Sequence, residues 1–366
     1  MINTGLVGTI LATHSSYATI PLSLQFLTIA LTLIPVSLLM GKFGRRPMFL
    51  IGAMSAFVGC LVIACAIYYK LFSLFIFGSI LLGFSQANQQ FYRYAAADNV
   101  SISLKSKAIS LVLAGGLIAA ILGPEVSRYS FDFFPDYIYL ATYLFAAIIQ
   151  IINFLILIFI NIKKPIPSKK INRPLSDVLF QKNLIIASLA AAVGYSPMSF
   201  IMTAAPLQIV NVCKLGDSAS ATVIQWHVIA MFAPSFFTGT IINSLGNRRV
   251  MMIGLFLYAF SISFTIIGQT IEHFWIALFL CGLGWNFLYV GGSDIIAKSA
   301  LPEERAKVQG VTDFIIFVFV ATGSFLAGAL HSTLGWEIMM FYTSIPIFIL
   351  FMSIIIIKPD GIMVRC

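Results

Sequence analysis

Apolar runs of about twenty residues recur from one end of this sequence to the other, and they constrain the fold more than any other feature. A helix needs about 20 apolar residues to cross the hydrocarbon core of a bilayer, which is about 30 Å thick. The chain has 366 residues, of which 60% are hydrophobic and 10% are charged. Because soluble domains carry about 25% charged residues, this composition excludes a soluble globular fold. We therefore expect an all-α polytopic membrane protein.

Polar residues between the apolar runs predict eleven long transmembrane helices. We expect them at about residues 18–40, 48–69, 71–97, 108–128, 137–161, 183–211, 219–242, 250–270, 274–297, 308–331 and 337–357. The apolar stretch 1–12 is shorter and spans only about 18 Å as a helix. We therefore expect about twelve helices, the first of them truncated through a mis-called start or a degraded gene.

Lysine and arginine fall almost entirely into alternate loops. Of the 22 basic residues, 18 lie in one set of loops, three lie in the opposite set, and Arg93 lies inside a predicted span. Loops rich in lysine and arginine stay on the cytoplasmic side. We therefore expect a multi-pass inner-membrane protein whose central loop and C-terminus are cytoplasmic. The net charge of +9 is explained by this topology and not by nucleic-acid binding.

Two arginine-containing loops indicate an internal repeat. Gly41–Gly52 reads GKFGRRPMFLIG and Leu245–Gly254 reads LGNRRVMMIG, and an offset of 203 residues superposes Arg45 on Arg248. The repeat predicts two helix bundles, residues 1–162 and 183–366, joined by a basic linker at 163–182. Two such halves are typical of a secondary transporter.

With this repeat and the Gly-Arg-Arg sequence at residues 44–46, the chain resembles the major facilitator superfamily over nearly its whole length. The resemblance implies two pseudo-symmetric six-helix bundles. In the family's loop motif, roughly G-x-x-x-D-R-x-G-R-R, Ser37 replaces the first glycine and Gly41 the aspartate, and Asn243 stands at the acidic position of the second half. Trp226–Gly239 and Phe91–Asp98 also resemble a proteobacterial permease subgroup, some of whose members are assigned to riboflavin uptake.

Polar and aromatic residues inside the spans are the candidate solute-binding residues, because lipid would leave their polar groups unsatisfied. Residues 86, 89, 90 and 93 recur at helical spacing and therefore share one face. The resemblance implies that the fourth and tenth helices line a central cavity. The candidate lining residues are Gln86, Gln89, Gln90, Arg93, Gln225, Trp226, Trp285, Asn286 and Tyr289. Arg93 either binds the solute or clamps two helices together.

Acidic residues and a histidine within the spans are the candidates for coupling and gating. Glu125, His227 and Asp313 are the coupling candidates. Glu125 has an alternative role as the ion-pair partner of Arg128, three residues away. The expected cytoplasmic gate comprises Arg45, Arg46, Asp98, Arg248, Arg249 and Asp294. In it Asp98 approaches Arg45 or Arg46, and Asp294 approaches Arg248 or Arg249; the alternative is surface ion pairs of little net energy.

These observations predict a secondary active transporter that moves a small organic solute by alternating access. The alternatives are a specific importer of riboflavin or another vitamin, a drug/proton antiporter, and a non-transporting membrane sensor. The sequence holds no phosphate-binding loop, nucleophile elbow, HExxH motif or cluster of metal ligands, so we expect no enzyme activity, cofactor or metal. The expected partners are the lipid bilayer, the solute and protons as the candidate coupling ion, and the chain is expected to be a monomer.

Overall fold

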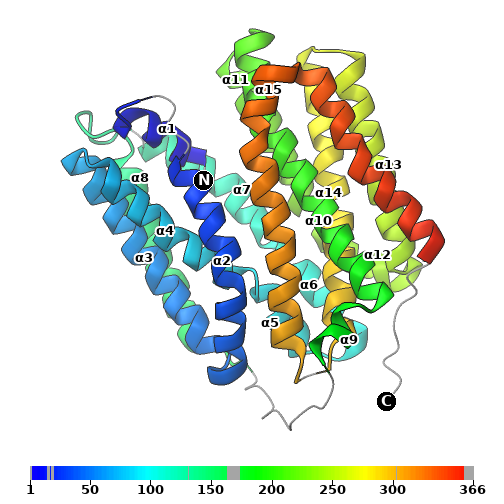
Figure 1. Ribbon diagram of the computed structural model, residues 1–366. Helices are drawn as coiled ribbons and strands as arrows, with labels where there is room; N and C mark the ends of the chain where they lie inside the picture. Colours follow the sequence, from blue (N-terminus) through cyan, green and yellow to red (C-terminus); the bar gives the residue numbers. More distant parts are fainter. Residues whose placement is uncertain are drawn as a thin grey trace. The chain divides into compact units, whose positions relative to one another are not determined.

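The computed structural model of the chain, drawn in Figure 1, describes residues 2–14, 17, 20–130, 132–162, 174–301 and 303–357. These residues form helices and contain no strand. The long helices are α2 (Ile20–Phe43), α3 (Arg45–Tyr69), α4 (Phe72–Gln89), α8 (Leu140–Phe159), α10 (Lys182–Pro206), α13 (Asn247–Ile267), α14 (Ile271–Ser299) and α15 (Arg305–Ile357). The shorter helices are α1 (Ile2–Leu11), α5 (Tyr92–Asp98), α6 (Lys105–Ala114), α7 (Gly116–Ser130), α9 (Leu175–Leu179), α11 (Asp217–Phe232) and α12 (Ser235–Leu245).

Many of these helices are long and apolar enough to cross a membrane. Within the described ranges nine qualify, and the consecutive pair α11 and α12, bent by 42°, makes a tenth. The long ribbon of α15 contains two of them, Arg305–Ala327 and Thr333–Ile357, with Gly335 at a positive φ of 75° near their junction. Each of the eleven expected long spans coincides with a helix, part of a helix or two consecutive helices. The predicted all-α polytopic fold is therefore confirmed.

Four of the expected spans are interrupted. The span at 108–128 is divided between α6 and α7 at Gly115, and the other three are interrupted for different local reasons. Pro234 stands between α11 and α12, and proline has no N–H with which to continue the helical ladder. Pro206 ends α10, and six residues of π-helix, Leu207–Val212, follow it. The break between α4 and α5 involves no proline and falls at Gln90 and Phe91, directly after a run of amide side chains.

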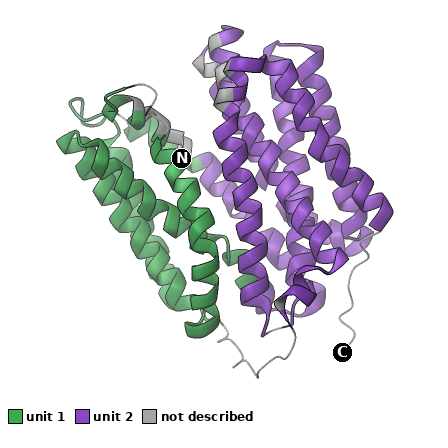
Figure 2. Cartoon of the chain, viewed as in Figure 1, with its two compact units in different colours: residues 1–95, 122–167 green, residues 96–121, 168–366 purple. Residues whose placement is uncertain are grey.

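The chain divides into two compact units, which Figure 2 shows in different colours. Unit 1 comprises residues 1–95 and 122–167, and unit 2 comprises residues 96–121 and 168–366. The segment 96–121, which includes α6, thus groups with the C-terminal residues. The two bundles expected from the repeat, 1–162 and 183–366, stay a prediction, and each unit is described by itself below.

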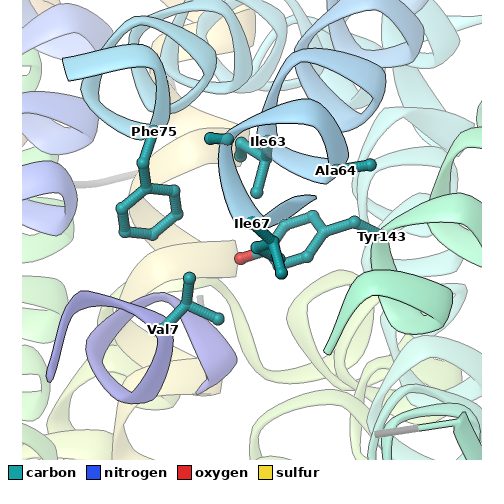
Figure 3. Packing of buried hydrophobic residues seen from close by; sticks show 7 residues of the cluster. Val7, Ile63, Ala64, Ile67, Phe75 and Tyr143 are labelled. Carbon is teal, nitrogen blue, oxygen red and sulfur yellow. The ribbon is translucent and has the colours of Figure 1, made fainter. Parts of the chain in front are cut away.

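Apolar side chains from four helices meet in the core of unit 1 (Figure 3). The buried cluster contains Val7 of α1, Ile63, Ala64, Ala66 and Ile67 of α3, Phe75 of α4 and Tyr143 of α8. Val7 is 1% exposed, so this side chain holds the ten-residue α1 against the three longer helices. A helix of ten residues spans about 15 Å, roughly half of a hydrocarbon core. The truncation of the first helix stays a prediction.

Helix α14 is the central helix of unit 2. It packs against α10, α11 and α13, and nearly every residue from 284 to 297 is buried. A Cβ atom added to Gly254 of α13 would lie 3.1 Å from the carbonyl oxygen of Gly284, so the two backbones are in close contact. Small residues allow this kind of packing between membrane helices. The side chains of α14 are thereby enclosed by protein rather than by lipid.

The internal repeat is visible in the backbone before α3 and α13. Gly44 precedes α3 with φ 95° and ψ 162°, and Gly246 precedes α13 with φ 83° and ψ 153°. Positive φ values strongly favour glycine. Matching these two glycines gives an offset of 202 residues, one fewer than the arginine pairs suggest. The structural counterpart of Arg45 is therefore Asn247, and the expected register of 203 is wrong by one residue.

Candidate functional site

Aromatic rings from three helices gather around Trp285 and Tyr289 in unit 2. The indole of Trp285 stacks on the ring of Tyr289, with centroids 5.0 Å apart and planes at 19°. Tyr195 of α10 lies edge-on to both rings, at 5.6 Å and 5.3 Å, and Phe232 of α11 lies edge-on to Trp285 at 5.6 Å. Phe317 of α15 contacts Tyr195 at 5.4 Å. We call these five rings the aromatic cluster.

The indole N–H of Trp285 is one of the polar groups of the aromatic cluster, together with the hydroxyls of Tyr195 and Tyr289. Trp285 is 2% exposed, and its Nε1 has no hydrogen-bond partner among the described residues. Buried tryptophans usually find an acceptor for this N–H. The sequence predicted Trp285 and Tyr289 as lining residues but missed Tyr195. The sequence did contain a signal for Tyr195, because this tyrosine directly follows Ala190–Gly194, a run of mostly small residues within a predicted span.

Asn286, the neighbour of Trp285, is fully satisfied within unit 2. Its Oδ1 accepts a hydrogen bond from Thr238 Oγ1 at 2.6 Å. Its Nδ2 donates to the carbonyl of Met231 at 2.7 Å and to the hydroxyl of Ser235. These bonds join α14 to both sides of the α11–α12 bend. Asn286 therefore holds the bend in place, while its predicted contact with a solute stays a prediction.

The three candidates on α11 lie in different environments. Trp226 is 42% exposed and packs edge-on to Trp275, with centroids 5.8 Å apart, so it is not part of the aromatic cluster. His227 is fully buried, and its Nδ1 lies 2.6 Å from the carbonyl oxygen of Leu278 on α14. Gln225 is half-buried. Helical spacing separates these neighbours by about 100° each, which explains their divergence.

Arg93 lies at the break between α4 and α5 in unit 1. Its guanidinium is buried and donates to the backbone carbonyl of Gln90 at 2.7 Å, to the side-chain Oε1 of Gln90 at 3.1 Å and to Tyr94 Oη at 3.1 Å. The two carbonyl oxygens of Gln90 and the Tyr94 ring, 4.3 Å away, thus compensate its charge within the chain. The two roles expected for Arg93, binding the solute or clamping two helices, stay predictions. Of the other residues on this face, Gln89 donates to Ser85 at 3.4 Å.

Asp294 is the centre of a buried polar group near the end of α14. Its carboxylate lies 2.6 Å from Lys298 Nζ and accepts hydrogen bonds from Asn247 Nδ2 at 2.9 Å and Ser106 Oγ at 2.8 Å. The expected pairing of Asp294 with Arg248 or Arg249 is therefore wrong. Lys298 lies one turn along the same helix, where an ion pair forms without help from another element. Asn247, which precedes these two arginines, stands where the motif has an arginine.

The start of α6 is fastened to the C-terminal helices at several points. Lys105 Nζ donates to the carbonyl of Ala297 at 3.0 Å, near the C-terminus of α14. Asn243 Nδ2 donates to the carbonyl of Ser103 at 3.1 Å. A Cβ atom on Gly239 of α12 would lie 2.5 Å from the carbonyl oxygen of Ser106, so only glycine fits there. We call residues 103–110 the α6 clasp; the sequence analysis did not assign it a role.

Three of the remaining gate candidates have partners within their own units. Asp98 pairs with Arg305 of α15 at 3.0 Å within unit 2. In unit 1, Arg45 donates to the carbonyl of Phe91 at 3.4 Å, and Arg46 donates to the carbonyl of Ile158. The two arginines therefore contribute to packing inside unit 1, and a gate contact with Asp98 stays a prediction.

Two of the coupling candidates differ in their environment. Glu125 pairs with Arg128 at 2.5 Å, with the two side chains 36% and 65% exposed, as the alternative interpretation predicted. Asp313 is fully buried on α15. Among the described residues no three histidine, cysteine or acidic side chains gather as metal ligands.

A family model for the Major Facilitator Superfamily matches residues 1–212 and 187–361 of the chain. The chain belongs to the Major Facilitator Superfamily. Within it, the riboflavin transporter RfnT of Brucella anthropi is 38% identical over 337 residues, which cover 91% of this chain and 84% of that relative. The chain is thus a multi-pass secondary transporter of this superfamily, as the sequence predicted.

Solved structures of superfamily transporters share this fold. The fucose:proton symporter FucP of E. coli matches with a TM-score of 0.76 over 97% of this chain and 93% of its own, at 12% identity. The human organic anion transporter MFSD10 matches with a TM-score of 0.71 over 95% of this chain and 83% of its own, at 16% identity. At such identities the likeness concerns the fold alone.

Proposed function

We propose that this superfamily member imports riboflavin, or a flat heterocyclic solute of the same class, across the inner membrane. The aromatic cluster is the observation that carries the proposal. The stacked rings of Trp285 and Tyr289 offer planar faces to a conjugated ring system, and the indole Nε1 without a partner offers a donor to a carbonyl group. Solute sites combine apolar walls with a few such polar groups. The name of the relative RfnT supports the choice of riboflavin.

The proposal includes an orientation and an energy source. The charge distribution of the loops supports a cytoplasmic central linker and C-terminus, and a reporter enzyme active only outside the cytoplasm should stay silent when fused to the C-terminus. We infer a monomer driven by a gradient, with protons as the coupling ion. The candidate carriers are Glu125, His227 and Asp313.

The α6 clasp is the proposed cytoplasmic gate, together with the ion pairs at Asp98 and Asp294. Contacts that favour one conformation must break when the transporter changes to another. Hydrogen bonds from Lys105, Ser106 and Asn243 fasten the clasp in the conformation described here. At Asn243, where the family pattern has an acid, the gate thus uses a hydrogen bond between uncharged groups. Arg45, Arg46, Arg248 and Arg249 stay proposed members of the gate.

The test is uptake of labelled riboflavin by a riboflavin-requiring bacterial strain that expresses this chain and has no importer of its own. We expect accumulation, and we expect purified protein to lose tryptophan fluorescence on titration with riboflavin. Trp285→Phe should weaken binding by roughly 10-fold, because one stacking contact and the donor change together. Trp275→Phe is the matched control, since Trp275 stacks on Phe279 outside the aromatic cluster. Absence of uptake and binding in the unmodified protein would contradict the proposal.

The other predicted lining residues stay proposals for the same solute. They are Gln86, Gln89, Gln90, Gln225, Trp226, Asn286 and Tyr289. For Arg93 we propose the alternative role, a clamp at the break between α4 and α5, because its guanidinium already donates to Gln90 and Tyr94.

A further inference from the structure

Gln25 of α2 is a buried amide that no described residue satisfies. Its side chain is 0% exposed, and neither Nε2 nor Oε1 has a hydrogen-bond partner in the described part of the chain. Burying an amide without a partner is costly, and a membrane span offers no bulk water as a substitute. An amide kept at this position therefore requires a functional explanation.

The surroundings of Gln25 show that its backbone lies at a close contact between α2 and α4. A Cβ atom on Gly83 of α4 would lie 2.6 Å from the backbone oxygen of Gln25 and 2.8 Å from Thr28 Cβ. Gln86 lies one turn beyond Gly83 on the same face of α4, and its buried Oε1 also has no partner among the described residues. Unsatisfied amide atoms therefore occur on both helices of this contact.

Other polar residues of α2 do not share this property. Thr28 Oγ1 donates to the carbonyl of Leu24 at 2.7 Å, and Thr32 Oγ1 donates to the carbonyl of Thr28 at 2.6 Å. Hydroxyl groups satisfied by their own helix are common in membrane spans. The lack of partners is thus specific to the amide and is no general feature of polar groups on α2.

The chemistry of a primary amide limits what can satisfy it. Gln25 presents an acceptor oxygen beside a donor nitrogen, so its best complement presents an N–H beside a C=O. A lactam or imide edge of a heterocycle has this arrangement and forms two hydrogen bonds with one amide. A carboxylate would face the amide oxygen with no donor, and an apolar ring would leave every group unpaired.

We propose that Gln25 binds the lactam or imide edge of the transported heterocycle, with the Gln86 oxygen as an acceptor that shares the single N–H of this edge. This proposal rests on the proposed function, because it assumes a flat heterocyclic solute. It adds a specificity-determining residue that distinguishes heterocycles by their hydrogen-bonding edge rather than by their shape. A site that hydrogen-bonds a solute group rejects analogues that lack the group, since the site's own polar atoms are then left unpaired.

The experiment compares riboflavin with riboflavin methylated at N3, which has lost the imide N–H and keeps the ring system. Binding is measured by tryptophan fluorescence on the purified full chain, and uptake is measured in cells. We expect the unmodified protein to favour riboflavin by roughly 10- to 100-fold. Gln25→Met keeps the length of the side chain and removes the amide. It should reduce this preference to within about 3-fold and leave affinity for the methylated analogue nearly unchanged.

Thr32→Val is the matched control on α2, because its hydroxyl is satisfied by its own helix, and it should keep the full preference. Gln25→Leu is a second variant in case Gln25→Met does not give monodisperse protein. A Gln25 variant that retains the preference for riboflavin would overturn the inference, as would equal binding of both compounds by the unmodified protein. In both of these outcomes the protein still binds riboflavin, so only the inference about Gln25 fails. If the unmodified protein binds neither compound, the proposed function is wrong as well.

Discussion

Helices α4 and α14 occupy corresponding positions in the internal repeat, yet α4 is followed by a break at Gln90 and Phe91 whereas α14 continues for 29 residues. The two helices also satisfy their polar side chains differently. Asn286 of α14 has three partners on the α11–α12 segment. On α4, Gln86 Oε1 and Asn88 Oδ1 are buried without a partner in the described residues.

The difference suggests a division of roles between the two units. The amide of Asn286 and the carboxylate of Asp294 belong to satisfied networks, and such networks in a low-dielectric interior are rigid and specify one arrangement, so this part of α14 is suited to be a fixed support for the aromatic cluster. Trp285 Nε1 and Ser293 Oγ are the buried polar atoms of α14 without a partner among the described residues. A helix with unsatisfied amides is suited to bind something that supplies the missing partners. The predictions below test this contrast, in order of decreasing effect on stability or transport.

The largest effect is expected at the end of α14. Asp294→Ala leaves the partly buried ammonium of Lys298 and the buried amide of Asn247 without their shared acceptor. Removing one member of a buried pair costs about 3–5 kcal/mol, so thermal unfolding in detergent should occur at a clearly lower temperature. The double variant Asp294→Asn with Lys298→Met removes both charges and should recover most of the loss. An unchanged unfolding temperature for the single variant would show that α14 is not the rigid support.

Asparagine substitutions compare the two helices directly. Asn286→Leu removes three hydrogen bonds to the α11–α12 segment and should destabilise the protein by about 2–3 kcal/mol. Asn88→Leu is nearly isosteric and removes one bond, Nδ2 to the carbonyl of Phe84 on its own helix, so its effect should be below about 1 kcal/mol. Thermal unfolding of both variants gives the comparison. Equal losses would remove the distinction between a satisfied and an unsatisfied helix.

Arg93 tests whether the break after α4 is held by the chain itself. The guanidinium already donates to Gln90 and Tyr94, so we expect its planar fork not to be needed for binding the solute. Arg93→Lys keeps the charge and removes only the fork. This variant should therefore retain uptake, with KM within about 3-fold. Arg93→Ala should mainly lower the amount of folded protein in the membrane. A large rise in KM for Arg93→Lys at normal abundance would instead place the guanidinium on the solute.

The smallest effect on stability is expected at Glu125. The pair with Arg128 is exposed, and exposed pairs contribute about 0–1 kcal/mol, so Glu125→Gln should unfold at almost the same temperature as the unmodified protein. This makes the variant a clean probe of coupling. Loss of concentrative uptake with retained exchange of solute would assign Glu125 to the coupling step, and full accumulation would exclude it.

Most of the fold followed from the sequence, because the length of an apolar run is a local property. Sequence reasoning also singled out Trp285 and Tyr289, since aromatic residues beside an amide stand out within a span, and their role in binding the solute stays a prediction. It missed Tyr195, Gln25 and the α6 clasp. Their roles depend on which faces of distant helices meet, and no local pattern encodes this. The register of the repeat was wrong by one residue because Asn247 stands at the position of Arg45, so the arginine pair of the second half comes one residue later.

The sequence by itself determined that the chain crosses a membrane many times, that it repeats internally and that it resembles the family to which it belongs. Hydrophobic length, periodicity and motif spacing are sufficient for these conclusions. Only the tertiary structure decided the partners of the buried polar groups. Asp294 joins Lys298, Asn247 and Ser106 rather than the loop arginines, and Gln25 is left with no partner among the described residues. A buried polar group must be satisfied by whichever atoms the packing brings within about 3 Å, and packing is a property of the folded chain.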